Sequence, residues 1–235
     1  GILGNDYLTD GKTYDPRLYD VTLQHLLEHT AGIDVDKDPM FLKPNLDQGE
    51  LITWVLDNRK FLTEPGKIFD YSNFGYCVLG RVIEKLSGMS YEEYVKENIF
   101  AQAGISDMHI AGDLQTDRRS NEVYYYDNDD KDPYSMKTAR MDAHGGWIGS
   151  SVDLVRLLSQ VDGFSNKTDI LKPRLIAMMT SQSKAVKALD NKKASNPDIK
   201  QSTYAKGWRL DLTGSHQGWE HGGSFLGSRA KLYRQ

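Results

Sequence analysis

The sequence has few of the residues that cross-link a chain, anchor it in a membrane or attract nucleic acid. It contains one cysteine, Cys77, so no disulfide can form within the chain. No apolar run approaches the roughly 20 residues that a membrane-spanning helix requires, and the mean hydropathy is -0.57. The 29 Lys and Arg residues are outnumbered by 33 Asp and Glu residues, which leaves no basic stripe for nucleic acid. We therefore expect a soluble protein with no nucleic-acid partner and no membrane span.

The length and the hydrophobic spacing predict a mixed α+β fold. A chain of 235 residues can bury roughly 70–75% of the surface that it exposes when unfolded, which is enough for a core without metal or disulfide staples. Apolar residues recur at helical spacing, and three short stretches near the end alternate as strands do. The predicted helices cover 22–32, 51–56, 76–86, 91–100, 151–161 and 171–179, and the predicted strands cover 204–212, 219–224 and 228–233. Residues 21–203 are thus predicted to be mainly helical, with polar loops over 113–140 and 181–202, and residues 204–235 to form sheet strands.

Several common functional motifs are absent. Gly11-Lys12-Thr13 ends like a phosphate-binding loop, but Asp6 stands where that loop requires its first glycine. The chain has no G-x-G-x-x-G fingerprint for a dinucleotide. Gly222-Gly223-Ser224 begins a G-x-S-x-G match that Leu226 breaks. These classes of nucleotide-binding protein and hydrolase are excluded.

One segment matches a zinc motif. His25-Leu26-Leu27-Glu28-His29 has the H-x-x-E-H pattern of a class of metallopeptidases and places both histidines on one helical face. No downstream helix offers an obvious glutamate as third ligand, and the two leucines fit a buried amphipathic helix. The pattern favours a structural helix, so we expect neither a metal nor a cofactor, and we keep a metallopeptidase as the remote third reading.

The same residues, from His25 onward, are the first part of a resemblance that spans most of the chain. The segment from His25 to Gly32 resembles the H-L-L-x-H-T-[SA]-G segment of the serine β-lactamase and penicillin-binding-protein-like family, in its class C, esterase and DD-peptidase branch. Tyr71-Ser72-Asn73 resembles that family's Y-x-N motif, and Gly145-Gly146-Trp147 resembles a later glycine pair. Gly207-Trp208 and His221-Gly222-Gly223-Ser224 are similar to its G-W strand and its H-x-G third motif. The matches occur in the family's order.

The resemblance implies a β-lactamase/transpeptidase-like fold and acyl transfer by a serine. Such chemistry needs a base, donors for the oxyanion and a cation that lowers the pKa of the base. Tyr71 would be the base, and Asn73 would bind the substrate amide or the catalytic lysine. His221 would place a polar or cationic group near Tyr71. Gly222 and Gly223 would let the strand approach the substrate, and the backbone N–H of Ser224 would be an oxyanion donor.

The chain departs from the family pattern at the nucleophile. In the family an S-x-x-K motif opens a helix well before Y-x-N, whereas no serine precedes Ser72 here. Two S-x-x-K matches, Ser181 to Lys184 and Ser228 to Lys231, both lie downstream of Tyr71. Ser228 falls on a predicted strand, where residues i and i+3 point to opposite faces. Neither match is expected to supply the nucleophile.

Two hypotheses follow from the missing nucleophile. In the first, residues 1–235 are one β-lactamase-related domain, incomplete at both ends, of a longer serine hydrolase that acts on a peptide, ester or amide. The start at Gly1 without an initiator methionine agrees with this view. The partners would then be a small-molecule or peptide substrate and the remainder of the same chain. In the second, the protein is a non-catalytic family member with a binding or structural role.

The sequence says less about localisation and assembly. Asn166-Lys167-Thr168 is a glycosylation sequon in a polar loop, and it favours a secreted protein, with a mitochondrial or cytoplasmic location as the alternative. Cys77 lies on the apolar helix after Tyr71, so we expect it to be a buried small hydrophobe. Nothing in the sequence indicates an oligomeric state.

Overall fold

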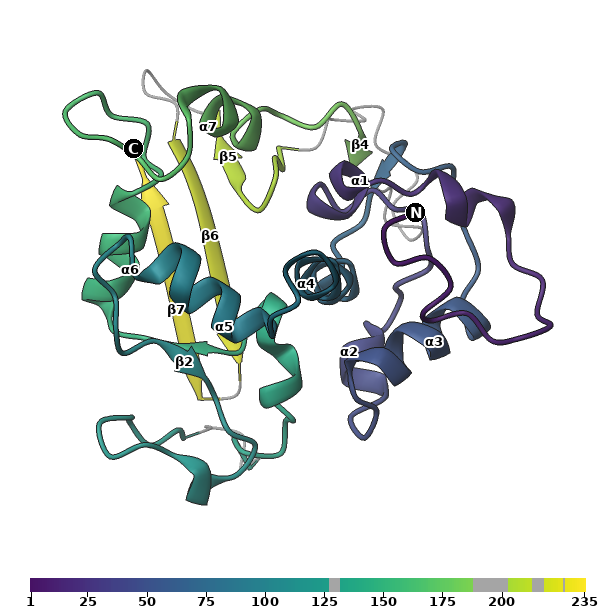
Figure 1. The fold of residues 1–235 in the computed structure, drawn as a ribbon, viewed down its shortest axis with the longest axis horizontal. Helices are drawn as coiled ribbons and strands as arrows, with labels where there is room; N and C mark the ends of the chain where they lie inside the picture. The colour runs from purple at the N-terminus through teal and green to yellow at the C-terminus, as the bar shows by residue number, and fades with distance from the viewer. Residues whose placement is uncertain (127–131, 188–202, 213–217, 226) are drawn as a thin grey trace, which may run out of the picture.

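The computed structural model describes residues 1–126, 132–187, 203–212, 218–225 and 227–235. The rest, including 127–131 of the predicted loop at 113–140 and 188–202 of the loop at 181–202, lies outside the described residues. The N-terminal helices form one side of the molecule and a three-stranded sheet forms the other, with helix α4 between them (Figure 1). The fold is thus mixed α+β, as predicted.

The N-terminal side consists of short capped helices. They are the 3₁₀ turn η1 (Pro16–Asp20), α1 (Leu23–Leu27), α2 (Pro39–Leu42) and α3 (Gln48–Asn58). Thr22 accepts a hydrogen bond from the His25 N–H at the start of α1. Helix α2 was not predicted, although Asp38 caps it and Pro39 occupies its first turn, where a missing N–H costs nothing.

Helix α4 (Asn73–Ser87) is the longest helix and connects the two sides. Ser72 caps its start, and Gly88 ends it in the left-handed conformation with φ +71°. A Cβ added at Gly80 would lie 2.6 Å from the Ala143 side chain, so glycine lets the turn η4 (Ala139–His144) pack against α4. Buried Arg81 then pairs with Asp142 across this contact, at 2.5 Å.

The segments after α4 are short. They comprise α5 (Tyr91–Val95), a π turn η2 (Lys96–Phe100), η3 (Gln115–Asp117), α6 (Ser151–Ser159) and α7 (Pro173–Met179). The predicted helix over 91–100 is therefore α-helical only in its first half. Strands β1 (Ile68–Phe69) and β4 (Val186–Lys187) pair in parallel, and β2 (His109–Ile110) and β3 (Trp147–Ile148) pair antiparallel.

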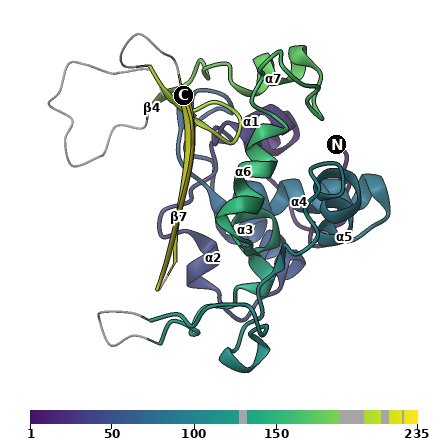
Figure 2. The ribbon, with the colours of Figure 1, turned by 90° about the vertical axis from the view of Figure 1, so that its left-hand side faces the viewer.

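The C-terminal sheet has the antiparallel order β5-β6-β7. Its strands are β5 (Arg209–Asp211), β6 (Gly218–Phe225) and β7 (Ser228–Arg234). The predicted strand over 204–212 is shorter than expected because Gly207, at φ +85°, turns the chain. Figure 2 shows the sheet edge-on, with the described helices on one side of it.

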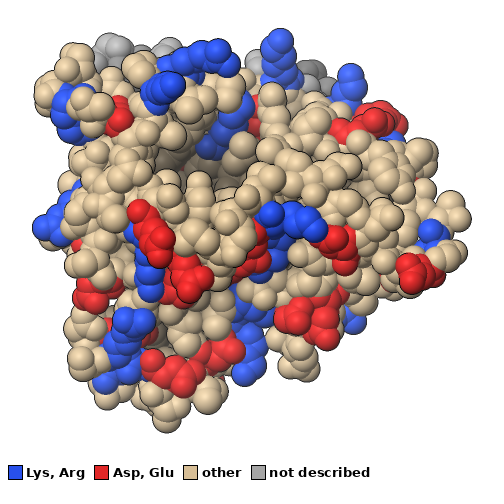
Figure 3. All heavy atoms as spheres, in the orientation of Figure 1, with Lys and Arg blue, Asp and Glu red and all other residues tan. Residues whose placement is uncertain are grey.

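Three apolar clusters support this arrangement. The second of them joins the helices to the sheet, because Phe225 of β6 packs against it; its buried members are Met40, Leu51, Cys77 and Met141. Cys77 is fully buried, as predicted. No helix in the described part of the chain is long and apolar enough to cross a membrane. On the face shown in Figure 3, the surface is hollowed between β6 and α4, with basic side chains along the upper edge of the hollow.

Candidate active site

Tyr71 lies in the turn that enters α4, and two neighbouring contacts hold that turn. The Ser72 hydroxyl accepts a hydrogen bond from the Gly75 N–H at 3.0 Å, and the Ser72 N–H donates to Nδ1 of His29 at 3.0 Å. Ser72 is buried and faces away from its neighbours, while Tyr71 exposes 44% of its surface. The turn therefore presents the Tyr71 phenol and fixes its backbone from behind.

Asn73 points back toward Tyr71 and is tied to a carboxylate. Its Oδ1 lies 3.5 Å from the Tyr71 hydroxyl, and its Nδ2 donates to Oδ2 of Asp38 at 2.8 Å. The Asn73 N–H also donates to Asp38, at 3.3 Å. Asp38 therefore sets which end of the Asn73 amide faces Tyr71, namely its oxygen.

Strand β6 brings the third motif to the same place. Strand β5 pairs with Gly218–Glu220 only, which leaves the edge of β6 from His221 onward without a described partner strand on that side. A Cβ added at Gly223 would meet nothing within 4 Å, and one at Gly222 would come only into ordinary contact. The two glycines therefore leave open space beside the strand, and Ser224 lies on the same open edge.

His221 is held by a residue that the sequence did not single out. Its Nε2 lies 3.0 Å from the hydroxyl of Tyr204, and its ring centroid lies 6.5 Å from that of Tyr71. Tyr204 is 4% exposed and packs edge-on against the ring of His29 at 4.6 Å. The imidazole thus rests against a buried aromatic cluster.

The electrostatics of the site keep both groups in their neutral forms at neutral pH. Burial lowers the pKa of His221, and the positive charge of Arg209 lowers it further, against opposing effects of Gly222 and Glu220. Burial raises the pKa of Tyr71 and the charge of Asp38 adds to the increase, whereas Arg209 opposes it. A Tyr71 base would therefore need an additional cation.

One cleft of 830 Å³ gathers all six residues that the resemblance implicates. Tyr71 and Asn73 form one wall, and the β6 residues from His221 to Ser224 form the other. Basic side chains outnumber acidic ones along it, and Lys231 is paired with Glu220 at 2.5 Å. The geometry can bind an acyl group between a phenol and a glycine-lined strand edge.

In the described structure, neither S-x-x-K match has a hydrogen bond between its serine and its own lysine; the lysine that donates to Ser181 is Lys206, at 3.1 Å, which is also paired with Glu28. The hydroxyl of Ser181 donates to the Met178 carbonyl at the end of α7, away from Tyr71 in the chain and outside the residues that line the cleft. Ser228 lies on β7, as predicted, and lines the cleft, but Lys231 three residues later points to the other face and is paired with Glu220. Ser228 thus lacks the neighbouring cation that would activate it.

The H-x-x-E-H segment is part of the scaffold. Glu28 is buried and pairs with Lys206 at 2.7 Å, and it accepts a hydrogen bond from Ser183 at 2.7 Å. Burial opposes ionisation of Glu28, but the hydrogen bonds from Lys206 and Ser183 outweigh it and lower the pKa. His29 is 3% exposed, and burial together with the charge of His221 lowers its pKa to about 3. These side chains join α1 to the segments that precede β5.

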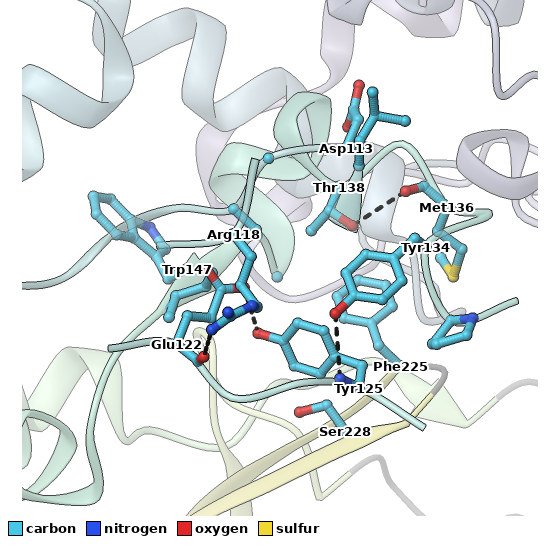
Figure 4. Close-up of a pocket in the computed structure, with 17 residues that line it drawn as sticks. Asp113, Arg118, Glu122, Tyr125, Tyr134, Met136, Thr138, Trp147, Phe225 and Ser228 are labelled. Carbon is cyan, nitrogen blue, oxygen red and sulfur yellow. Dashed lines mark hydrogen bonds between the residues drawn. The ribbon is translucent and has the colours of Figure 1, made fainter. Parts of the chain in front are cut away.

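A second, smaller pocket of 90 Å³ continues from the cleft past the end of the β6–β7 hairpin (Figure 4). It shares Trp147, Phe225 and Ser228 with the cleft. Its polar groups satisfy one another: the Tyr125 hydroxyl donates to Glu122 at 2.9 Å, and Arg118 donates to the Glu122 carbonyl. The polar groups in these hydrogen bonds are bonded to one another and are not turned toward a ligand. This pocket is therefore an extension of the cleft.

The site residues missed from the sequence are Asp38, Tyr76 and Tyr204. Each acts through a hydrogen bond to a segment far away in the chain, so no local motif marks it. Asp38 carried one usable signal, because Asp followed by Pro is a common helix start. Tyr204 stands four residues before Trp208 of the G-W match, and that match alone did not indicate a role for it.

Comparison with known proteins agrees with this geometry. A family model described as Beta-lactamase matches residues 6–233. A protein of Dichelobacter nodosus named "Probable fimbrial assembly protein FimD, serogroup H1" is 35% identical over 158 residues, which is 62% of this chain and 38% of the relative. Penicillin-binding protein 4* of Bacillus subtilis (strain 168) is 32% identical over 117 residues, 47% of this chain and 26% of the relative. The chain thus spans well under half of the length of these relatives.

The fold is also similar to that of solved structures of related proteins. The structure of a D-stereospecific amidohydrolase from Streptomyces sp. superposes with a TM-score of 0.73 at 21% identity, covering 98% of this chain and 68% of that one. At this identity the likeness concerns the fold, which is β-lactamase/transpeptidase-like. With the family match over nearly the whole chain, the chain belongs to the serine β-lactamase and penicillin-binding-protein-like family.

Proposed function

We propose that residues 1–235 provide the base, the oxyanion strand and the substrate cleft of a serine hydrolase that works through an acyl-enzyme on a peptide, ester or amide. The observation that carries this proposal is the convergence of Tyr71, Asn73 and the open edge of β6 on one cleft. Acyl transfer needs a base on one side of a carbonyl and oxyanion donors on the other. A phenol opposite a strand edge supports that arrangement.

The nucleophile and the activating cation come from polypeptide outside these residues in this proposal. Ser181 accepts from Lys206 but lies outside the cleft, Lys231 is paired with Glu220, and the pKa of Tyr71 is raised where a base requires it lowered. A serine followed by a lysine one helical turn later would supply both missing groups when inserted into the cleft. The serine hydroxyl would give its proton to the lysine–Tyr71 pair as its oxygen bonds to the carbonyl carbon, and the π electron pair would move onto the oxyanion at the Ser224 N–H. Collapse of this intermediate would re-form the carbonyl and expel the leaving amine or alcohol, which takes the proton back from the pair.

Covalent labelling of the full-length protein tests the proposal. We expect a fluorophosphonate or a β-lactam to add to one serine outside residues 1–235, and Tyr71→Phe to slow that addition. Tyr91→Phe is the control, because Tyr91 is a tyrosine that does not line the cleft and whose ring lies 6.2 Å from that of Trp147. A native protein of 26.6 kDa with no associated polypeptide would contradict the need for further chain.

The alternative function is a non-catalytic family member that binds a ligand or partner in the same cleft. The observation that favours it is that, among the described residues lining the cleft, no serine is hydrogen-bonded to a lysine, since Ser181, which accepts from Lys206, lies outside the cleft. It predicts no covalent adduct on any serine under conditions that label an active serine hydrolase. Stoichiometric zinc in the purified protein would instead revive the metallopeptidase reading of the His25 segment.

We also propose that the protein is secreted and carries a sugar on Asn166. Asn166 lies in the exposed loop between α6 and α7, which the ion pairs of Lys167 with Asp162 and Asp169 hold in shape. An exposed sequon in a defined loop is accessible to the transferase. A mass shift on enzymatic deglycosylation of the native protein, lost in Asn166→Gln, is the expected result.

A further inference from the structure

One carboxylate ties the beginnings of two helices together beside the cleft. Oδ1 of Asp38 accepts the Met40 N–H at 3.0 Å and so caps α2. Oδ2 accepts two N–H groups of Asn73, from the side-chain amide at 2.8 Å and from the backbone at 3.3 Å. Asn73 is the first residue of α4, where a backbone N–H has no partner within the helix. Asp38 therefore fixes the start of α2 against the start of α4, where Asn73 lines the cleft.

The position of Asp38 calls for a carboxylate and for no other planar side chain. Both of its oxygens face N–H donors, one on α2 and the other on α4. A side-chain amide in its place would turn an oxygen to one helix and an NH₂ group to the other, so that two donors would face each other. The aspartate thus imposes one orientation on the Asn73 amide, with Nδ2 toward Asp38 and Oδ1 on the side of the Tyr71 hydroxyl, 3.5 Å away.

We propose that Asp38 is the positioning residue of Asn73, and that it makes the Asn73 amide an acceptor on the side that faces Tyr71. A group that enters the cleft beside Tyr71 must then donate an N–H or O–H to Oδ1 of Asn73. A carbonyl oxygen at the same place would face another oxygen, and the orientation therefore selects against it.

The charge of Asp38 favours one kind of donor. Its field reaches the phenol, because it raises the pKa of Tyr71. Among the described residues, no lysine or arginine forms an ion pair with Asp38, so an ammonium group that enters here would meet an uncompensated negative charge behind the Asn73 oxygen. This consequence rests on the proposed function: the activating cation from outside residues 1–235 would bind between Tyr71 and Asn73.

Nitrogen NMR of the Asn73 side chain tests the orientation without any turnover. Full-length protein is labelled with ¹⁵N-asparagine, and Asn73→Ser assigns the Nδ2 signal by its loss. Asp38→Ser keeps a preferred capping residue for α2 but removes the oxygen that accepts from Asn73. We expect the Nδ2 signal to shift in this variant and its protons to exchange faster with water. Asp36→Ser is the matched control, because Asp36 is exposed and the Asn73 amide donates to Asp38 instead.

Covalent labelling of the same proteins tests the consequence for the cleft. Asp38→Ser should react with a fluorophosphonate about 10–100-fold more slowly than the wild type, as expected when a hydrogen bond to an ionised group is lost, and Asp36→Ser at the wild-type rate. An unchanged Nδ2 signal or an unchanged labelling rate in Asp38→Ser would overturn the proposal. A wild type that is not labelled at all would contradict the proposed function, and the Nδ2 signal would still decide the orientation. If Asp38→Ser does not fold, Asp38→Asn, which also caps α2, is measured in the same two ways.

Discussion

The chain contains the tripeptide His-Gly-Gly twice, at 144–146 and at 221–223, and the two copies have different structures. The first begins at His144, the last residue of η4, and continues with Gly145 at φ +148°. The second is extended within β6 and continues into the open strand edge. His144 and Gly145 of the first copy line the cleft, as does the whole second copy, so the two copies differ in backbone and surroundings.

The two histidine rings differ in their partners. Both ring nitrogens of His144 are buried without a hydrogen-bond partner in the described structure, and burial together with Arg140 and Arg81 lowers its pKa to about 3. His221 instead has an oriented bond to Tyr204. The comparison teaches that a short motif acquires a chemical role from the hydrogen bonds around it, since the letters alone are identical.

The largest expected difference in kcat/KM is between a substitution opposite the second copy and a substitution near the first. Tyr71→Phe removes the proposed base opposite His221 and should lower kcat/KM by about 10²–10⁴-fold, the usual contribution of general base catalysis. Tyr91→Phe, beside Trp147, the residue that follows the first copy, should leave kcat/KM near that of the wild type. Steady-state kinetics of the full-length protein measure both, and equal losses would remove the distinction.

The glycines of the two copies should differ in their tolerance of a methyl group. A Cβ at Gly146 would lie 2.9 Å from the Thr138 carbonyl oxygen and 3.1 Å from the Met141 backbone, so Gly146→Ala should lower the free energy of unfolding by about 2–3 kcal/mol. Gly223→Ala meets open space and should change it by less than about 0.5 kcal/mol, while its methyl group obstructs the cleft. Urea unfolding checks the first statement; similar midpoints for both variants would argue against it.

The buried rings should make stability depend on pH. The folded-state pKa of His144 and of His29 is about 3, below the value near 6.5 in an unfolded chain. Below pH 6.5 the unfolded state binds protons that the folded state does not, so stability is complete above pH 6.5 and falls toward pH 3, by up to about 1.4 kcal/mol per pH unit for each ring.

His144→Gln removes one of these two rings, so the free energy of unfolding should decrease less steeply as the pH falls. The change in slope should correspond to at most one proton taken up on unfolding. Urea midpoints measured between pH 7 and pH 5 give the slope for the wild type and the variant. An unchanged slope would show that His144 is protonated or exposed in the folded protein, and the contrast with His221 would then disappear.

The smallest expected effect concerns charge at the second copy. Arg209→Gln removes a positive charge that disfavours protonation of His221, so the pKa of His221 should rise. Arg229→Gln is the matched control, because Arg229 also lines the cleft but has no such effect on His221. Titration of the His221 ring signals by NMR measures both, and a lower pKa in Arg209→Gln would contradict the assignment.

Much of the secondary structure could be predicted because its signals are local. Helices α3 and α4 were recognisable from apolar spacing and from the glycine that ends α4, and β6 and β7 from their short alternating runs. Helix α2 was missed because it is only four residues long and lies in a polar stretch. The strand expected over 204–212 was too long because Gly207 turns the chain at φ +85°, where a Cβ would also come within 3.3 Å of the Tyr76 hydroxyl.

The residues of the cleft could be named only where a family motif carries them. Tyr71, Asn73 and His221 stand in such motifs, whereas Asp38, Tyr76 and Tyr204 act through contacts across long stretches of chain. A pattern of sequence letters contains no information about which distant group approaches a side chain. The sequence resemblance therefore located both walls of the cleft but not the hydrogen bonds that orient them.

The sequence by itself determined the family, the order of the motifs and most element types, because these depend on local spacing and on recurring short patterns. Only the tertiary structure decided the protonation states of the site residues. Burial and charge set the neutral forms of Tyr71 and His221, and the Tyr204 hydroxyl beside the His221 ring belongs to a phenol that packs against His29 of the N-terminal side. Proton positions depend on partners brought together by folding, and those partners are distant in the chain.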